Sequence, residues 1–126
     1  MGYKYLILGA GKMGEAIAFN LLKQRDTGLV TLTDKDKRVL NLGRALQDTT
    51  AIECEYMITD IRKVIQRELF KGFDVVISAL PALMSPELIS SAIDAGVGFC
   101  DLGGVVAVSN HCMSMNERAV KAGMPI

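Results

Sequence analysis

The stretch from residue 9 to residue 14 reads Gly9-Ala10-Gly11-Lys12-Met13-Gly14 and follows the apolar run Tyr5-Leu6-Ile7-Leu8. A strand, a turn with three glycines and a helix, in this order, are typical of dinucleotide-binding folds. A helix over residues 12–23 would offer its unpaired N–H groups and the positive end of its dipole to a phosphate. The sequence therefore predicts a phosphate-binding turn, formed by Gly9, Gly11, Lys12, Met13 and Gly14.

Each glycine of this turn has a separate physical role in the prediction. Gly9 allows the tight turn out of the strand, where a side chain would clash. Gly11 has no Cβ, so the main chain can approach a pyrophosphate closely. Gly14 lets the helix lie close against the strand.

The composition indicates one neutral globular domain, covering residues 1–126. Half of the 126 residues are hydrophobic, and 14 basic residues balance 14 acidic ones. We therefore expect no electrostatic capture of nucleic acid and no binding to an anionic membrane. The chain begins with no basic and apolar leader and has no apolar run of membrane-spanning length, so we expect a cytoplasmic protein.

The three cysteines, Cys54, Cys100 and Cys112, have no metal-ligand spacing, and we predict no metal site. Their odd number and apolar surroundings indicate buried thiols in a reducing compartment. His111 precedes Cys112, but neighbours in sequence are poor evidence for a catalytic pair. We interpret the two as a loop histidine beside a cysteine at a helix start.

Apolar runs alternate with helical patterns along the whole chain. The predicted strands are 5–8, 29–33, 51–58, 73–80 and 97–102. The first helix is expected to bury Met13, Ile17 and Leu21, and a third helix to bury Ile61, Val64, Ile65 and Leu69. Predicted helix starts are Ser85-Pro86, with a stop at Gly96, and a capping box of Ser114 and Glu117, after an irregular stretch.

This alternation predicts an α/β Rossmann fold, a doubly wound parallel sheet with strand order 3-2-1-4-5. The loops after Leu8, Thr33, Ile58, Ala79 and Leu102 should then share one rim of the sheet. Ligands of such sheets bind beyond the carboxyl ends of the strands.

Asp34 ends the second strand, where a carboxylate can accept hydrogen bonds from the hydroxyls of the adenosine ribose. Its charge would repel the extra phosphate of NADP, so we expect NAD as the cofactor. Lys35 and Arg38 could still accommodate that phosphate, and NADP stays open. The alternative is that Asp34 is only a turn or cap residue.

Two further strand ends carry candidate cofactor contacts. Asp60 could meet the adenine amino group, and it is equally well explained as a helix N-cap. The turn Ala79-Leu80-Pro81 is small and apolar, which would let the ribose and nicotinamide pass close to the backbone. The alternative for this turn is an ordinary strand exit.

Together these motifs resemble the saccharopine dehydrogenase family, which includes saccharopine reductases, lysine 6-dehydrogenases and carboxynorspermidine dehydrogenases. The resemblance spans Tyr5 to Pro125 and is most particular at Val76-Ile77-Ser78-Ala79-Leu80-Pro81 and Asp101-Leu102-Gly103-Gly104. It implies NAD(P)-dependent hydride transfer at a carbon that bears nitrogen, in an amino acid or related amine, as in lysine metabolism.

The same resemblance implies a substrate and dimerisation domain beyond this chain, and a homodimer in the full-length protein. The chain is then expected to be an N-terminal cofactor domain that binds nucleotide and turns over little. Asp101 is the one local carboxylate that could approach the nicotinamide, but a strand-end role explains it better. We assign no catalytic residue.

Two other classes share the glycine turn and the acidic residue. One is a regulatory nucleotide-sensing module of the kind attached to potassium transport systems, which would act by changing shape. The other is a methyltransferase, against which the Ala-Leu-Pro and Asp-Leu-Gly-Gly turns argue. Fold alone cannot separate these classes.

Overall fold

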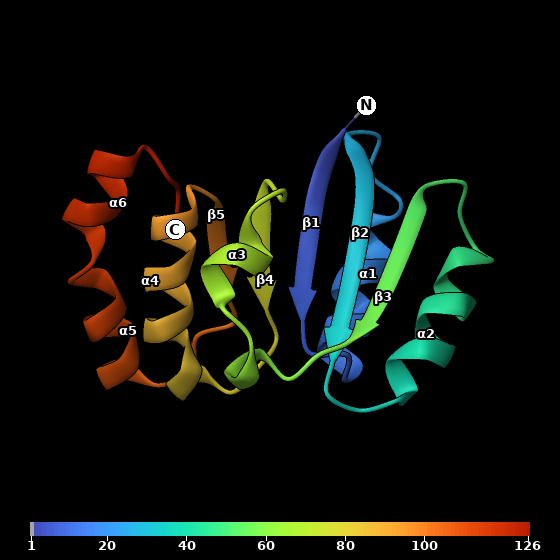
Figure 1. Ribbon diagram of the computed structural model, residues 1–126, viewed down its shortest axis with the longest axis horizontal. Helices are drawn as coiled ribbons and strands as arrows, with labels where there is room; N and C mark the ends of the chain where they lie inside the picture. Colours follow the sequence, from blue (N-terminus) through green and yellow to red (C-terminus); the bar gives the residue numbers. More distant parts are fainter. Residues whose placement is uncertain (1) are drawn as a thin grey trace.

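The computed structural model describes residues 2–126, which form a five-stranded parallel sheet (Figure 1). The strand order is β3-β2-β1-β4-β5, so the predicted doubly wound topology is confirmed. The strands are β1 (Tyr3–Leu8), β2 (Thr27–Asp34), β3 (Glu53–Ile58), β4 (Val75–Ser78) and β5 (Gly98–Asp101). All their carboxyl ends point to one edge, at the bottom of Figure 1.

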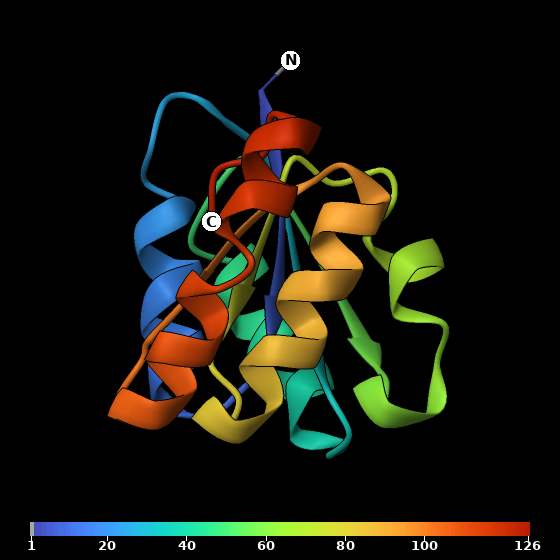
Figure 2. The ribbon, with the colours of Figure 1, turned by 90° about the vertical axis from the view of Figure 1, so that its left-hand side faces the viewer.

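Helices cover the sheet in two layers, each with its own apolar core. They are α1 (Lys12–Leu21), α2 (Arg38–Gln47), α3 (Gln66–Phe70), α4 (Ser85–Ala95), α5 (Val106–Met113) and α6 (Asn116–Ala122), with short 3-10 turns η1 (Ile61–Lys63) and η2 (Ala82–Met84). Helix α1 lies on one side of the sheet and α3 on the other (Figure 2). Within residues 2–126, no helix is long and apolar enough to cross a membrane.

The buried face of helix α1 is only partly the predicted one. Met13 is 55% exposed, whereas Gly14, Ala18 and Leu22 are buried. At its first turn the helix packs so closely on the glycine turn that no side chain fits at Gly14, and Met13 beside it points away from the core. Ile17 and Leu21 are partly buried and pack against the same core, so the prediction is right for these two residues and wrong for Met13.

The predicted single helix after Asp60 is divided into η1 and α3. Val64 and Ile65 adopt extended backbone angles, and Ile65 is 70% exposed rather than buried. β-branched side chains resist helical packing, and both fall at the break. The prediction of a shared buried face for Val64 and Ile65 is therefore wrong.

Two predicted helix caps are also wrong. Ser85 lies inside the first turn of α4, which Met84 precedes, and its hydroxyl donates to Asp101 instead of capping the helix. Ser114 donates to the His111 carbonyl and does not cap α6. The stretch before Ser114, predicted to be irregular, is helix α5, which has no buried residue and so no apolar periodicity to reveal it.

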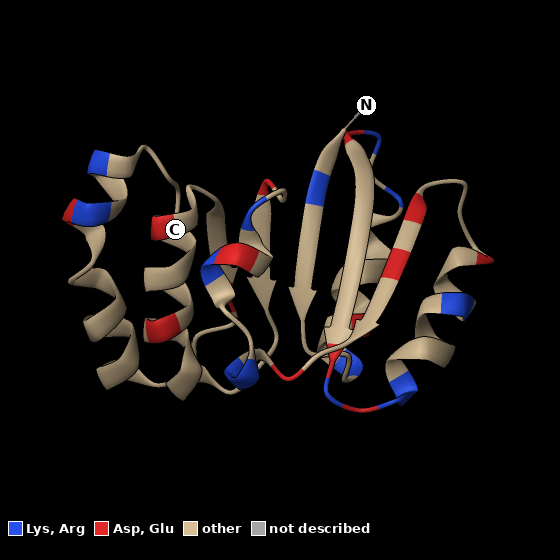
Figure 3. Cartoon of the chain, viewed as in Figure 1, with Lys and Arg blue, Asp and Glu red and all other residues tan. Residues whose placement is uncertain are grey.

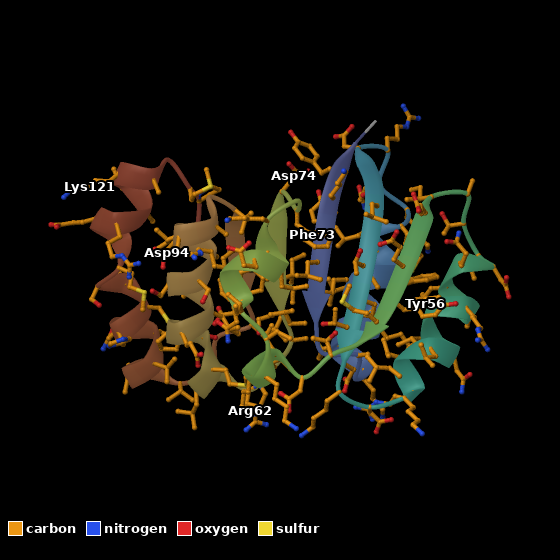
Figure 4. The ribbon with its side chains drawn as sticks, viewed as in Figure 1. Tyr56, Arg62, Phe73, Asp74, Asp94 and Lys121 are labelled. Atoms are coloured by element: carbon orange, nitrogen blue, oxygen red, sulfur yellow. The ribbon has the colours of Figure 1, made fainter. Side chains whose placement is uncertain are left out.

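The contact between α2 and β3 requires a glycine. A Cβ on Gly43 would lie 2.1 Å from Cδ1 of Tyr56 and 2.4 Å from its Cγ. The Tyr56 side chain lies between β3 and α2 (Figure 4). Gly43 therefore allows the helix to lie directly on the aromatic ring, although glycine weakens a helix.

Gly43→Ala is expected to destabilise the chain by about 2 kcal/mol, because the new methyl overlaps the ring of Tyr56. Helix propensity alone would predict a gain of up to about 1 kcal/mol. Urea unfolding of the variant measures which effect wins. In a Tyr56→Ala background the penalty should be smaller but not absent, because the Cβ at position 56 still lies 2.7 Å from the new methyl, and an equal penalty there would rule out the ring as its cause.

Candidate functional site

A cavity of about 330 Å³ opens at the carboxyl ends of the strands. The loops that follow β1, β2, β3 and β4 all contribute to its wall, as predicted for the rim of the sheet. Eight of the residues expected to bind cofactor line it: Gly9, Gly11, Asp34, Lys35, Asp60, Ala79, Leu80 and Pro81.

The glycine turn is built by very close backbone packing. A Cβ on Gly14 would lie 1.8 Å from the carbonyl oxygen of Gly9, so a side chain there cannot fit. Gly9 has a φ of 97° and donates its N–H to the Thr33 carbonyl at 2.9 Å. These contacts fix the start of α1 against the ends of β1 and β2.

The first hydrogen bond of α1 runs from the N–H of Glu15 to the carbonyl of Gly11, at 2.9 Å. The N–H groups of Lys12, Met13 and Gly14 come before it and have no partner within the helix. Lys12 and Met13 do not line the cavity wall, but they occupy the exposed first turn of α1 directly after Gly11. These donors are therefore available for a phosphate at the helix start.

Asp34 is tied to the glycine turn. Its Oδ2 accepts a hydrogen bond from the Ala10 N–H at 2.7 Å, and its Oδ1 accepts one from the Asp36 N–H at 2.9 Å. Its side chain is only 12% exposed. The carboxylate thus holds the turn in place and uses the Ala10 N–H, which leaves phosphate binding to the N–H groups that follow.

The charge of Asp34 is stabilised where it lies. Burial alone would raise the pKa of this carboxyl, but the N–H groups of Ala10 and Asp36 and the guanidinium of Arg38 lower the pKa below its usual value. The Arg38 Nη2 lies 3.7 Å from Asp34 Oδ2. Asp34 is therefore an ionised acceptor at neutral pH, with a cation beside it.

Asp60 and Arg62 form the wall contributed by the loop after β3. Asp60 Oδ1 accepts the N–H of Arg62 at 3.0 Å and so caps η1, which confirms the predicted N-cap role on a shorter helix. Figure 3 shows acidic and basic residues interspersed along this rim, and Figure 4 places Arg62 there. Arg62 lines the cavity, although its local sequence does not distinguish it from a solvated surface charge.

The turn after β4 closes the apolar side of the cavity. The Ala79 N–H donates to the Leu8 carbonyl at 2.8 Å, which holds the turn beside the glycine turn. Met84 of η2 lines the same wall and was not anticipated from the sequence, because nothing in its local pattern marks it. Thr33 and Thr59, at the ends of β2 and β3, were missed for the same reason.

A larger cavity of about 510 Å³ lies beside β5 and α5, away from the glycine turn. Asp101 lines it and accepts the hydroxyl of the buried Ser85, so this strand-end residue is bonded to a side chain of α4. Because neither the glycine turn nor Asp34 lines this cavity, its greater size does not make it the nucleotide site.

The prediction of three buried cysteines is only partly right. Cys54 is buried, Cys112 is half-buried and Cys100 is exposed. Burial raises the pKa of all three thiols, which disfavours the nucleophilic thiolate. His111 and Cys112 both lie late in helix α5, not in a loop and at a helix start.

Several solved dehydrogenases share this fold at low sequence identity. Saccharopine dehydrogenase (L-Glu forming) from Saccharomyces cerevisiae is 22% identical, with a TM-score of 0.73 over 98% of this chain and 26% of the yeast chain. Shikimate 5-dehydrogenase from Mycobacterium fortuitum is 15% identical, with a TM-score of 0.69 over 98% of this chain and 43% of that one. Scyllo-inositol dehydrogenase from Lactobacillus casei is 16% identical, with a TM-score of 0.68 over 98% and 36%.

These likenesses show the fold, and this chain spans about a quarter of the yeast enzyme's length. A family described as the saccharopine dehydrogenase NADP binding domain matches residues 5–126. The match includes the glycine turn, Asp34 and all five strand ends. The chain therefore belongs to the saccharopine dehydrogenase NADP binding domain family, the cofactor domain of dehydrogenase-type oxidoreductases.

Proposed function

We propose that this chain binds NAD(P) for an oxidoreductase that acts on the CH–NH group of an amino acid or related amine. Membership of the family supports the oxidoreductase class, and the resemblance at the turns after β4 and β5 supports the amine substrate. Substrate contacts and the acid–base residues are proposed to come from a further domain, and the full-length enzyme is proposed to be a homodimer.

The observation that carries the cofactor proposal is the link between Asp34 and the glycine turn. The two features bind adjacent parts of one ligand: Asp34 accepts the ribose hydroxyls, and the start of α1 receives the pyrophosphate. Ala79, Leu80 and Pro81 then line the path of the nicotinamide half. A single bound dinucleotide could therefore contact the loops after β1, β2, β3 and β4, all of which line the cavity.

We propose NAD as the preferred cofactor, although the family carries NADP in its description. Asp34 is ionised and lines the cavity, so with the ribose hydroxyls on its carboxylate the 2′-phosphate of NADP would meet a negative charge. Lys35 and Arg38 line the same cavity and reduce that repulsion. NADP binding is therefore expected to be weaker than NAD binding, but measurable.

Calorimetric titration of the chain with NAD, NADP and S-adenosylmethionine tests the proposal. NAD should bind most tightly, NADP more weakly, and S-adenosylmethionine not at all. Tighter binding of NADP would overturn the NAD preference and keep the oxidoreductase domain. Binding of S-adenosylmethionine alone, or of none of the three, would overturn the proposed function itself.

The regulatory alternative uses the same cavity without chemistry, and the family match favours the enzyme. Solved neighbours also act on hydroxyl compounds by name, so the substrate class needs its own test. In a protein that joins this domain to its substrate domain, NADH formation is expected with lysine or saccharopine. Formation with inositol or shikimate instead would contradict the amine assignment.

A further inference from the structure

Two arginines at the cofactor cavity each lie beside a carboxylate. Arg38 Nη2 is 3.7 Å from Asp34 Oδ2, and Arg62 Nε is 3.8 Å from Asp60 Oδ1. The arginine side chains are 61% and 64% exposed, so these ion pairs are weak and easily exchanged for a ligand. Each carboxylate therefore positions its arginine at the cavity without strongly competing for it.

The local geometry restricts Arg62 more than an exposed arginine usually is. The same Asp60 oxygen accepts its main-chain N–H at 3.0 Å and lies near its Nε. The main chain of Arg62 is hydrogen-bonded and its side chain lies near the same atom, in a 3-10 turn whose first residue, Ile61, is buried. This arrangement keeps the guanidinium at the rim, where Figure 4 shows it.

The position of Asp34 determines what Arg62 can meet. Strands β2 and β3 are neighbours, paired at Asp34 and Ile58, so the loop carrying Arg62 begins about 5 Å to one side of the ribose acceptor. A base attached to a ribose on Asp34 can extend over this loop, because the glycine turn lies on the opposite side, towards β1. Arg38 lies next to Asp34 itself and would therefore face the 2′ oxygen of a ribose held by that carboxylate.

We propose that Arg62 determines adenine binding by laying the plane of its guanidinium against the base. A guanidinium is flat and weakly hydrated, and it stacks on nucleobases as well as on aromatic side chains. This inference rests on the proposed function, since it assumes that the cavity holds an adenine dinucleotide. It assigns the two arginines to different parts of that ligand, Arg62 to the base and Arg38 to the 2′ position.

Titration of Arg62→Ala with AMP, NAD, NADP and nicotinamide mononucleotide tests this assignment. Loss of one stacking partner should weaken the three adenine ligands equally, by about tenfold, and leave nicotinamide mononucleotide unchanged. Lys63→Ala is the matched control, because Lys63 is the next cation along the same turn and does not line the cavity. It should bind all four ligands like the parent chain.

Arg62→Lys keeps the positive charge but removes the flat guanidinium, so it separates the effect of stacking from the effect of charge. It should show most of the loss seen in Arg62→Ala if stacking is the contact, and its full recovery of AMP binding would overturn the proposal. A loss confined to NADP would also overturn it, since Arg62 would then contact the 2′-phosphate.

The test distinguishes this inference from the proposed function. If the parent chain binds no adenine dinucleotide, the proposed function fails together with the inference. If the parent chain binds NAD and Arg62→Ala binds it equally well, only the inference fails. Arg62 is exposed, and an unchanged urea unfolding curve will show that the variant keeps its fold.

Discussion

Gly14→Ala is expected to destabilise the chain by about 3 kcal/mol and to abolish most nucleotide binding. Its Cβ would lie 1.8 Å from the Gly9 carbonyl oxygen and 2.9 Å from the carbonyl carbon, and both atoms belong to the backbone. No side chain can move to relieve the overlap, so α1 must shift away from the turn. The gain of about 1 kcal/mol in helix propensity is too small to compensate.

Gly11→Ala is the matched control for this prediction. Nothing lies within 4 Å of a Cβ at Gly11, whose φ of −76° suits any residue. Its stability should stay within about 0.5 kcal/mol of the parent chain, as at other unstrained surface positions. NAD binding should still weaken, because the new methyl lies where the pyrophosphate approaches. Urea unfolding and calorimetry separate the two effects, and equal stability of both variants would contradict the packing argument.

Asp34→Ala is expected to weaken NAD binding by about 100-fold, since it removes two charge-assisted hydrogen bonds to the ribose. The variant also frees the Ala10 N–H and loosens the glycine turn. NADP should lose much less affinity, because the repulsion of its 2′-phosphate disappears while Lys35 and Arg38 remain. The preference between the cofactors should therefore narrow or invert.

Asp48→Ala is a control with the same change in charge at the other end of α2, outside the cavity. It should leave both affinities unchanged. An unaltered affinity for NAD in Asp34→Ala would reduce Asp34 to a turn residue.

The lowered pKa of Asp34 adds a pH dependence with a defined sign. Because the folded-state pKa lies below the unfolded value, the ionised carboxylate stabilises the fold at neutral pH. This contribution falls away as the pH drops from the usual carboxyl range through the lowered pKa. The stability difference between the parent chain and Asp34→Asn should therefore shrink in acid, and a difference that grew in acid would contradict the hydrogen-bond geometry.

Local patterns predicted the parts of the site that depend on local geometry. The glycine turn needs three residues without side chains over six positions, and such a requirement is written in the sequence itself. Asp34 follows from the same logic, because a strand end in an alternating β-α chain must fall on the ligand rim. The sequence alone therefore predicted that the glycine turn and Asp34 would lie at the same cavity.

Which helix faces are buried, and which residues after β3 line the cavity, depends on neighbouring elements and could not be predicted from local patterns. The fully buried residues of α1 are Gly14 and Ala18, because the helix packs closely on the glycine turn, and the apolar period of the helix does not record that distance. The residues around Arg62 do not distinguish it from a solvated surface arginine. Only the pairing of β2 with β3 brings it to the cavity.

The sequence by itself therefore determined the phosphate-binding turn and the acidic residue beside it, since both rest on local backbone conformation, and it determined the topology because strands and helices alternate along the whole chain. The tertiary structure decided which helix faces are buried. It also decided that Ser85 donates its hydroxyl to Asp101 and does not cap its own helix, and that Arg62 lines the cavity. The physical reason is that burial and contact depend on what the rest of the chain places nearby, and that is fixed only when the sheet forms.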